Sequence, residues 1–438
     1  MEFGLHPGIL FGLAIAIFLA SHLVLRAPLP LAFLVTAVAT ALLGDFGIPF
    51  RHLVEGGFGF INLVLALFAG AFFGHMVRES GAADAAAAGI VHMCRARTLP
   101  VLTSIGATLF VVGMFVGLSG VAVLSAGVFV VPALRRIGYD DPTIAAFIAV
   151  MATAGMIAPP MNVPAMLIAD GVNMPWTNVS KALLALSLPL AAAALVWFTW
   201  GCGPSGNGPS GAGSTKQPAL PATNVNEGSA AACLRGLAPL IVIVAIWVSV
   251  RAFPTLIIDP ASPLILVIGG LVALPMMSRE KLGKAMMATF SGVPLLLAAV
   301  LVTVGVLVQI MTLTGVRGWL VINTMSLVAP WNYAGLLLGM PLLGGALTSI
   351  SVSDVVGVPA AFSFIGQDMI INVAALSGLA SLAEFVPPTA IAAVLSCYVV
   401  GGPTVGQVVR RAWPPMLVLA VLALAMLVFA KQLAGILT

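Results

Sequence analysis

One pattern of glycine, aspartate and paired proline occurs twice in this sequence and constrains its fold more than any other feature. Gly138 and Gly366 each open a Gly-x-Asp triplet, and each precedes a Pro-Pro pair by 21 residues, at Pro159 and at Pro387. The copies are 228 residues apart, and both prolyl pairs lie inside apolar stretches. Because proline lacks the amide donor and clashes with the preceding turn, each pair is predicted to break a helix. Helices broken at corresponding places in two halves indicate the midplane binding site of a transporter.

The low content of charged residues indicates that lipid rather than water surrounds most of these helices. Only 7% of the residues are charged and 61% are apolar, whereas roughly 25% are charged in a typical soluble protein. Runs such as 58–76 and 416–430 approach the length of about 20 residues that crosses a bilayer. The chain is therefore predicted to be an all-α polytopic membrane protein in a lipid bilayer. The first apolar stretch, 9–25, has no basic segment before it, so we interpret it as a retained membrane helix.

Several function classes find no support in the sequence. The net charge of +4 comes from cations at segment ends without interleaved aromatic residues, so no nucleic-acid partner is expected. The four cysteines show no CxxC spacing, and we interpret them as isolated thiols. HExxH and GxSxG motifs are absent, and so is the second aspartate of an intramembrane aspartyl protease. We expect neither an enzyme nor a bound cofactor.

A polar segment divides the chain into two halves. Residues 201–234 are rich in Gly, Ser, Pro and Asn, a composition that predicts a flexible linker. Residues 1–200 and 235–438 each carry one copy of the doubled pattern and are predicted to be two repeats. Each repeat is predicted to contain three spans, an apolar hairpin, a Pro-broken span and a final span, which gives about ten crossings besides the two hairpins.

The predicted hairpins are 99–131 and 333–362, and the predicted broken spans are 143–172 and 369–400. Each hairpin segment is too long for one crossing and too short for two full ones, and its middle is polar and rich in Gly and Ser. A re-entrant helical hairpin fits such a segment, provided that its tip is buried in protein or lines a cavity.

The loop charges predict that the two repeats have opposite orientations in the membrane. Arg135 and Arg136 follow the first hairpin, whereas 365–368 after the second hairpin has no cation. Conversely, three cations follow the second span of the second half, and the corresponding loop of the first half mixes one arginine with acids. Because cytoplasmic loops carry the excess of Lys and Arg, the linker is predicted to be cytoplasmic and both termini are predicted to lie outside.

Two acids lie in apolar segments, where burying a charge costs free energy. Asp354 is at the polar tip of the second hairpin, and Glu384 lies three residues before Pro387. A charge inside the membrane costs about 3 kcal/mol on insertion scales and usually faces a partner or a cavity. Each acid could bind a cation, take up a proton or pair with an arginine. The alternative is that one or both lie at a loop end in contact with water.

The helix breaks also offer backbone groups. Unwinding at 158–160 and 386–388 frees carbonyls for a small cation, and the half-helices that restart present partly positive N-termini to an anion. Asn162 and Thr389 add side-chain oxygens just after the prolines, and Ser119, Ser349 and Ser351 add hydroxyls at the hairpin tips. Ligation by neutral oxygens suits Na⁺, whereas a proton needs a titratable acid. The alternative is that the prolines only kink the helices.

Other charged and methionine residues are weaker candidates. Asp170 closes the first broken span and has no acidic counterpart in the second. Arg251 and Arg317 are interpreted as span-end residues, which leaves no arginine assigned to clamp an anion. The methionines at 151, 156, 161 and 166 are predicted to pack in the core.

The order of these motifs resembles the large membrane subunit of TRAP transporters (DctM type), within the ion transporter superfamily. The resemblance covers nearly the whole chain. In the first half it is carried by Gly117-Leu118-Ser119-Gly120, by the run from Pro132 to Asp140 and by Ala158-Pro159-Pro160. In the second half it is carried by Asp354, Ile365-Gly366-Gln367-Asp368 and Val386-Pro387-Pro388.

The resemblance implies an elevator-type secondary transporter of the bacterial inner membrane that takes up a small organic anion, such as a dicarboxylate, with Na⁺ as the coupling ion. It also implies a periplasmic substrate-binding protein and a small four-helix membrane subunit as partners. The substrate ligands that it implies are Ser119, Gly120, Asn162, Ser351 and Thr389. The Na⁺ ligands that it implies are Gly117, Ser119, Ala158, Pro159, Thr348, Ser349, Asp354, Glu384, Val386 and Pro387.

This sequence departs from the family pattern in three places. The first hairpin is shorter, and Ser125-Ala126 replaces the acid expected after its tip. The second hairpin is short between Asp354 and Pro359, and the central linker is longer than expected. A stand-alone or H⁺-coupled organic-anion carrier of the same superfamily, working without a binding protein, is therefore the alternative function.

Overall fold

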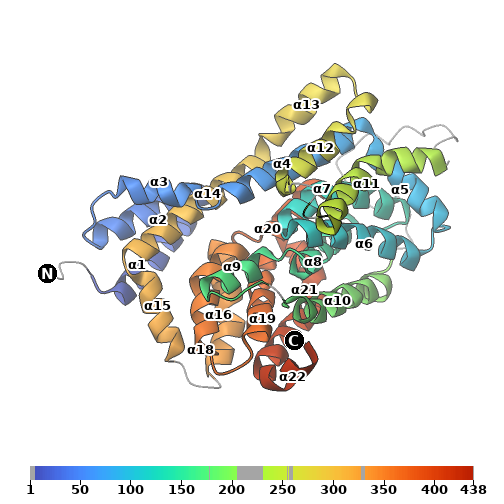
Figure 1. Cartoon of the computed structure of the whole chain (residues 1–438). Helices are drawn as coiled ribbons and strands as arrows, with labels where there is room; N and C mark the ends of the chain where they lie inside the picture. The colour runs from blue at the N-terminus through green and yellow to red at the C-terminus, as the bar shows by residue number, and fades with distance from the viewer. Residues whose placement is uncertain are drawn as a thin grey trace.

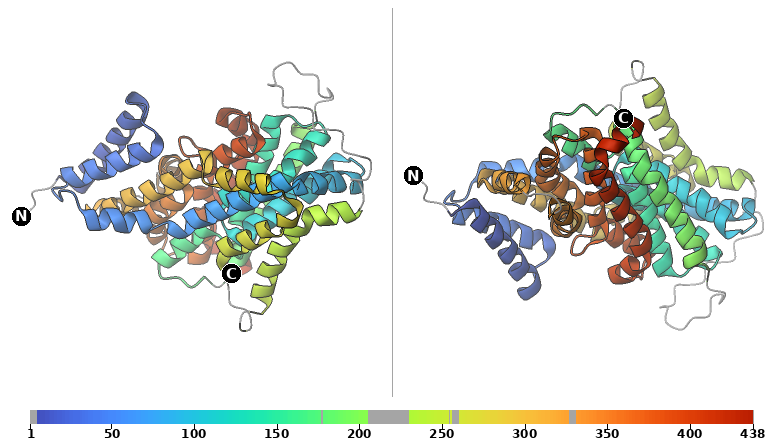
Figure 2. Two further views of the ribbon diagram at one scale, coloured as in Figure 1. Left: turned by 90° about the horizontal axis from the view of Figure 1, so that it is seen from above. Right: turned by 90° about the horizontal axis from the view of Figure 1, so that it is seen from below.

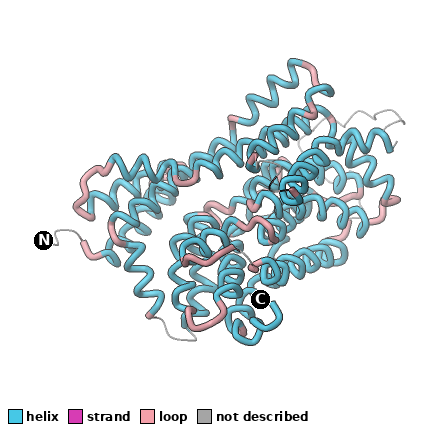
Figure 3. The backbone as a smooth tube through the Cα atoms, viewed as in Figure 1, coloured by secondary structure: helices cyan, strands magenta, loops and turns pink. Residues whose placement is uncertain are grey.

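The computed structural model describes residues 5–176, 178–204, 230–253, 255, 260–326 and 331–437. These residues form helices joined by short loops, and none of them lies in a strand (Figure 3). Eight of the described helices are long and apolar enough to cross a membrane, and six shorter helices are also apolar. The predicted fold class, an all-α polytopic membrane protein, is confirmed.

The described residues of the first half form ten α-helices, two of which continue as π-helices. They are α1 (Pro7–Leu19) with η1 (Ala20–Val24), α2 (Leu29–Leu43), α3 (Phe50–Phe58), α4 (Ile61–Ser80), α5 (Ala82–Met93), α6 (Thr98–Val116), α7 (Ser119–Arg136), α8 (Asp141–Ile157), α9 (Val163–Gly171) and α10 (Ser180–Val196) with η2 (Trp197–Gly201).

The second half repeats this order. Its elements are α11 (Ala230–Ala252), α12 (Ala261–Leu271), η4 (Leu274–Met276), α13 (Arg279–Thr289), α14 (Gly292–Leu313), α15 (Val316–Met325), α16 (Trp331–Leu347), α17 (Ser349–Val352), η5 (Ser353–Gly357), α18 (Val358–Ser363), α19 (Met369–Ser381), η6 (Leu382–Phe385), α20 (Ile391–Val400), α21 (Val405–Val428) and α22 (Ala430–Leu437).

Both hairpins and both helix breaks lie close to their predicted positions. In the first hairpin, α6 and α7 meet at Gly117 and Leu118, and its two legs extend beyond the predicted 99–131. The second hairpin consists of α16 followed by α17, η5 and α18, which meet at Thr348. The first broken span is α8 plus α9, and the second is α19 with η6 plus α20. The predicted linker lies outside the described residues at 205–229, and its last residues begin α11.

The two halves pack on each other reciprocally. α2 and α3 of the first half contact α14 of the second, whereas α12 and α13 of the second half contact α4 of the first. Figure 1 shows α4 and α14 as long helices along one side of the molecule, and Figure 2 shows the N-terminal helices at one end of it. Reciprocal contacts are what a twofold relation between repeats produces. Inversion across the membrane and the sides of the termini stay predictions.

The centre of the molecule is formed by the second leg of the first hairpin and by the broken spans. Every residue of α8 from Thr143 to Ile157 is buried, and so is every residue of α19 from Ile371 to Ser381. A helix that is apolar all round belongs inside a bundle or in a membrane. α7 and α20 pack against α8, and α10 and α21 cover the outside. The helices that lead into both breaks therefore lie in the interior, whereas the prolines at the breaks are half-buried, except for Pro387, which is exposed.

Close packing of the two halves depends on a glycine pair. A Cβ atom added to Gly305 of α14 would lie 2.4 Å from the carbonyl oxygen of Gly56 in α3. The substitution Gly305→Ala is expected to push these helices apart and to cost about 1–3 kcal/mol of stability, measured as a lower melting temperature in detergent. The matched control is Gly335→Ala in α16, where the added Cβ has no neighbour within 4 Å. An equal loss in both variants would contradict the close contact.

Candidate functional site

Each helix break is bonded to the tip of the hairpin in its own half. The first residue after each prolyl pair donates its amide to the hairpin: Met161 N to Met114 O at 3.3 Å, and Thr389 N to Gly345 O at 3.0 Å. Gly117 at the first tip has φ +69°, and a Cβ there would lie 2.8 Å from Met161 O. Glycine is therefore needed where the tip and the break approach most closely.

Glu384 joins both hairpin tips at the second helix break. Its Oε2 accepts hydrogen bonds from Ser119 Oγ at 2.5 Å and from Ala392 N at 3.0 Å. Its Oε1 accepts a hydrogen bond from Ser349 Oγ. Ser119 begins the second leg of the first hairpin, Ser349 begins that of the second, and Ala392 lies in the first turn of α20. One carboxyl group thus connects three elements that are far apart in the sequence.

The environment of Glu384 leaves its charge without a protein counter-ion. The side chain is only 3% exposed, and it forms no ion pair with any described Lys, Arg or His. Three hydrogen-bond donors offset part of the cost of burying a carboxylate, but removing such a charge from water costs several kcal/mol. A cation or a proton bound at this carboxyl group would supply the missing positive charge.

The cavity beside Glu384 is small. It has a volume of about 30 Å³ and is lined by Ser119, Gly120, Glu384 and apolar side chains that include Met156. A site of this size holds a water molecule or a small ion. It is too small for an organic solute. Gly120, predicted as a substrate ligand, therefore lies at a space that suits only an ion or water.

Asn162 organises the first helix break. Its Oδ1 accepts a hydrogen bond from Ala165 N at 2.9 Å and so caps α9. Its Nδ2 donates to Ile157 O at 3.0 Å and to Ser377 Oγ at 3.3 Å. The side chain is fully buried. Asn162 therefore closes its own break and ties it to α19 of the other half.

The two breaks are capped differently. At the spacing of 228 residues, Asn162 corresponds to Ala390, which has no side-chain cap, and Glu384 corresponds to Met156. In the second half, Glu384 bonds to the first turn of α20 from the other side of the break. The acid at the second break is thus replaced by a neutral methionine at the corresponding position of the first.

The remaining polar residues of the second tip stabilise the backbone there. Thr348 has φ +129°, caps α17 through Ser351 N at 3.2 Å and donates to Ser351 Oγ at 3.1 Å. Thr389 donates its hydroxyl to Gly345 O at 2.9 Å. These three side chains are buried. Ala158, Pro159, Val386 and Pro387 lie at the two breaks, and their role as Na⁺ ligands stays a prediction.

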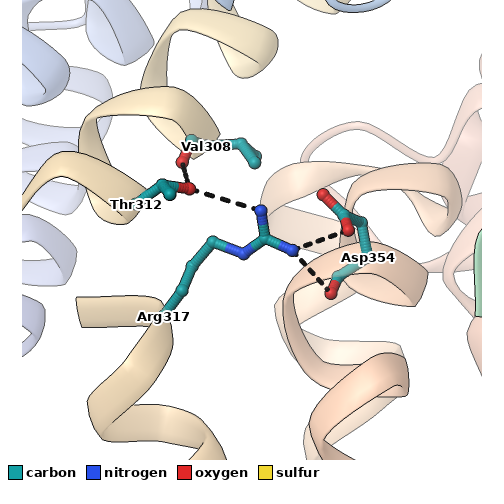
Figure 4. A network of polar contacts seen from close by, with 4 residues as sticks. All are labelled: Val308, Thr312, Arg317 and Asp354. Carbon is teal, nitrogen blue, oxygen red and sulfur yellow. Dashed lines mark hydrogen bonds and ion pairs between the residues drawn. The ribbon is translucent and has the colours of Figure 1, made fainter. Parts of the chain in front are cut away.

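Asp354 lies apart from the Glu384 cluster. It is in η5 and accepts a 2.7 Å hydrogen bond and ion pair from Arg317 of α15, which also donates to Asp354 O at 3.3 Å (Figure 4). Arg317 is held in turn by Thr312 Oγ1 of α14, at 3.3 Å. Asp354 therefore has a counter-ion and needs no bound cation. Its predicted role as a Na⁺ ligand stays a prediction.

Sequence analysis missed three groups that the structure brings to these clusters: Arg317, Ser377 and the Ala392 amide. Arg317 is 37 residues from Asp354, and Ser377 is 215 residues from Asn162. No helical or strand periodicity joins residues so far apart. Only the duplication hinted that Asn162 and Ser377 could meet, because it places them in the two broken spans.

The acids of the doubled Gly-x-Asp pattern have structural partners. Asp140 pairs with Arg411 of α21 at 3.2 Å, and Asp368 accepts from Ile371 N at 3.0 Å to cap α19. Both residues are at the N-cap position of a helix, but only the Asp368 side chain forms a cap hydrogen bond. They hold the loops before both broken spans without contacting Glu384.

Comparisons with known proteins give little beyond the fold. No protein-family model matches the sequence, and no curated protein matches it either. Among solved structures, the chain is similar to MtrF of Neisseria gonorrhoeae, described as illuminating a class of antimetabolite efflux pumps. The match has 12% sequence identity and a TM-score of 0.49, and it covers 87% of this chain and 84% of that one. A likeness this distant carries no activity over to this chain.

The cap of α9 predicts a stability effect. Asn162→Ala removes the cap and leaves Ile157 O without its side-chain donor, which is expected to cost about 2 kcal/mol. The measurement is the melting temperature in detergent. Asn323→Ala is the matched control, because Asn323 is exposed on α15 and its side chain bonds only to Trp319 O among the described residues. If both variants melt at the wild-type temperature, Asn162 has no such role.

The Arg317–Asp354 pair predicts non-additive variants. Each side chain is 28% exposed, so the interaction is expected to contribute about 1 kcal/mol. Arg317→Gln and Asp354→Asn should each lower the melting temperature, and the double variant should lose less than the sum of the two. Strictly additive losses would show that the pair contributes nothing to stability.

Proposed function

We propose that this chain is a secondary active transporter that moves a small organic anion together with a coupling cation bound at Glu384. The observation that carries the proposal is the buried Glu384 carboxyl group, which bonds to Ser119, Ser349 and the Ala392 amide and has no cationic partner in the described chain. The membrane character of the fold and the two broken helices support transport as the class of function.

The geometry supports coupling for an energetic reason. Without a cation, Glu384 places an uncompensated charge at the junction of both hairpin tips, which disfavours burying that junction. With a cation, the charge is neutralised and both tips can close on the second helix break. A ligand shifts a conformational equilibrium only by its difference in affinity for the two states. A cation at Glu384 is expected to bind more tightly to the closed state, because the carboxylate is buried there and has no water to compensate its charge.

Na⁺ is the first candidate for the coupling ion. The carboxylate of Glu384 and the hydroxyls of Ser119 and Ser349 form an all-oxygen set, of the kind that binds hard cations. A proton on Glu384 is the second candidate, because a serine hydroxyl can rotate and accept a hydrogen bond from the acid. From the resemblance, we further propose elevator movement in a bacterial inner membrane, with a binding protein and a small membrane subunit as partners.

The test is uptake of labelled carboxylic acids into liposomes that contain the purified protein, alone and with co-encoded partner proteins. An inward Na⁺ gradient is compared with a pH gradient and with no gradient. Saturable uptake driven by one gradient is expected, and saturable counterflow separates a carrier from a passive channel. Absence of saturable uptake under both gradients would overturn the proposal.

Glu384→Gln is expected to lower gradient-driven uptake by at least about tenfold, because the amide keeps the shape and the hydrogen-bond acceptor but removes the charge that binds a cation. Glu55→Gln is the matched control, since Glu55 is exposed on α3 and pairs with Arg51. The control is expected to transport normally. Unchanged cation dependence in Glu384→Gln would remove Glu384 from the coupling site.

A further inference from the structure

A second cavity lies beside the first helix break and is large enough for an organic molecule. Its volume is about 450 Å³, within the range of about 300–1,000 Å³ that is typical of small-molecule sites. Its walls come from α9 and from the chain that follows it, and Met161 directly after the prolyl pair is one of the lining residues. The cavity at Glu384 has only about 30 Å³. The solute therefore needs a different place from the ion.

The walls of this second cavity suit an apolar body. Met161, Met166 and Met174 line it, and thioether side chains adapt their shape to the molecule that they contact. Trp176 adds an aromatic face, and its Nε1–H donates to Pro160 O at 3.2 Å. The indole is thus fixed against the helix break, with its hydrogen-bond donor already used. Apolar contact is what this wall offers to a ligand.

One arginine at the edge of the cavity has no acidic partner among the described residues. Arg251, near the end of α11, donates from Nη2 to Met161 Sδ at 3.0 Å and forms no ion pair with a described residue. A thioether is a weak acceptor, whereas a guanidinium group binds a carboxylate through two parallel hydrogen bonds. Arg317, by contrast, is already paired with Asp354. Arg251 is therefore free, within the described chain, to bind an anion at this cavity.

An acid lies in the lining of the same cavity. Asp170, near the end of α9, is exposed and forms no ion pair within the described chain. Met161 lies two residues before α9 begins, and Asp170 lies in the last turn of α9, so the two residues are at opposite ends of this wall. A second carboxylate that extends along α9 from a ligand bound at Arg251 would approach Asp170, and like charges repel there.

We propose that this cavity is the binding site for the transported solute and that it selects a monocarboxylate with an apolar body. The carboxylate pairs with Arg251, the body packs among the methionines and Trp176, and Asp170 rejects a second acid. The inference rests on the proposed transport function and names the class of its substrate. Arg251 belongs to α11, which packs on α5 and α12, whereas α9 packs on α19 and η5. The solute thus lies between two groups of helices.

The test is equilibrium binding to the purified full chain in detergent, measured by calorimetry without any ion gradient. Four probes share one phenyl body: 3-phenylpropionate, 3-phenylpropanol, 3-phenylpropylamine and phenylsuccinate. The wild type is expected to bind 3-phenylpropionate at least about tenfold more tightly than the other three. Equal affinity for all four, or no binding of 3-phenylpropionate at millimolar concentration, would overturn the proposal.

Two variants test the charges separately. Arg251→Gln is expected to weaken 3-phenylpropionate binding at least about tenfold, and Arg251→Lys is expected to lose less because it keeps the charge. Asp170→Asn is expected to strengthen phenylsuccinate binding and to leave 3-phenylpropionate binding nearly unchanged. Arg51→Gln is the control for loss of an exposed arginine. The proposal would be contradicted if 3-phenylpropylamine bound most tightly and lost this binding in Asp170→Asn. The cavity would then be assigned to a cation.

The readouts separate this proposal from the transport proposal. Glu384→Gln is expected to keep 3-phenylpropionate binding while losing gradient-driven uptake, because the two cavities have different linings. If the wild type takes up other carboxylates with a cation but binds none of the four probes, the site assignment fails and the transport function stands. If the four probes bind in the expected pattern but no carboxylate is taken up, the site assignment stands and the transport function fails. Each variant is expected to melt at the wild-type temperature, which would show that a loss of binding does not come from a loss of folding.

Discussion

The arrangement of the interior depends on the hydrogen bonds that converge on Glu384. Both hairpin tips and the first turn of α20 meet at this one carboxyl group. Each tip is separately bonded to the helix break of its own half, so Glu384 links two local units into one centre. Neutral residues could provide similar packing. A buried acid adds a requirement for positive charge, and that requirement is what can connect the structure to an ion gradient.

The duplicated architecture has lost its symmetry at the two breaks. The first break is capped by a neutral amide, Asn162, and the second by the acid, Glu384. The space beside Glu384 fits an ion, and the space beside the first break fits an organic molecule. Under the two proposals, the two breaks serve different ligands. A duplicated helix break would then supply two backbone sites, and a few side chains would decide what each one binds.

Local features of this protein could be predicted from the sequence, and long-range partners could not. The proline pairs at Pro159 and Pro387 break their helices, so both breaks and the hairpins before them were located within a few residues. A third pair, Pro414-Pro415, lies inside the continuous helix α21, so a proline pair alone does not decide where a helix ends. The polar tips and the acid near Pro387 were also recognised as candidates. The bond between Ser119 and Glu384 joins residues 265 positions apart, and only the folded chain shows it. Asp354 and Arg251 illustrate the same limit, because the partner of a charge depends on tertiary packing.

Four charged residues, Asp354, Arg317, Glu384 and Arg251, differ in how their charges are balanced, and the difference bears on what is carried. Asp354 and Arg317 neutralise each other inside the protein. Glu384 and Arg251 have no ion-pair partner in the described chain and lie at separate cavities. One monovalent cation at Glu384 and one monoanion at Arg251 would leave both sites neutral, whereas either ligand alone would leave one charge uncompensated. Under the two proposals, the least costly loaded state carries both ligands together, and that is the energetic basis of symport.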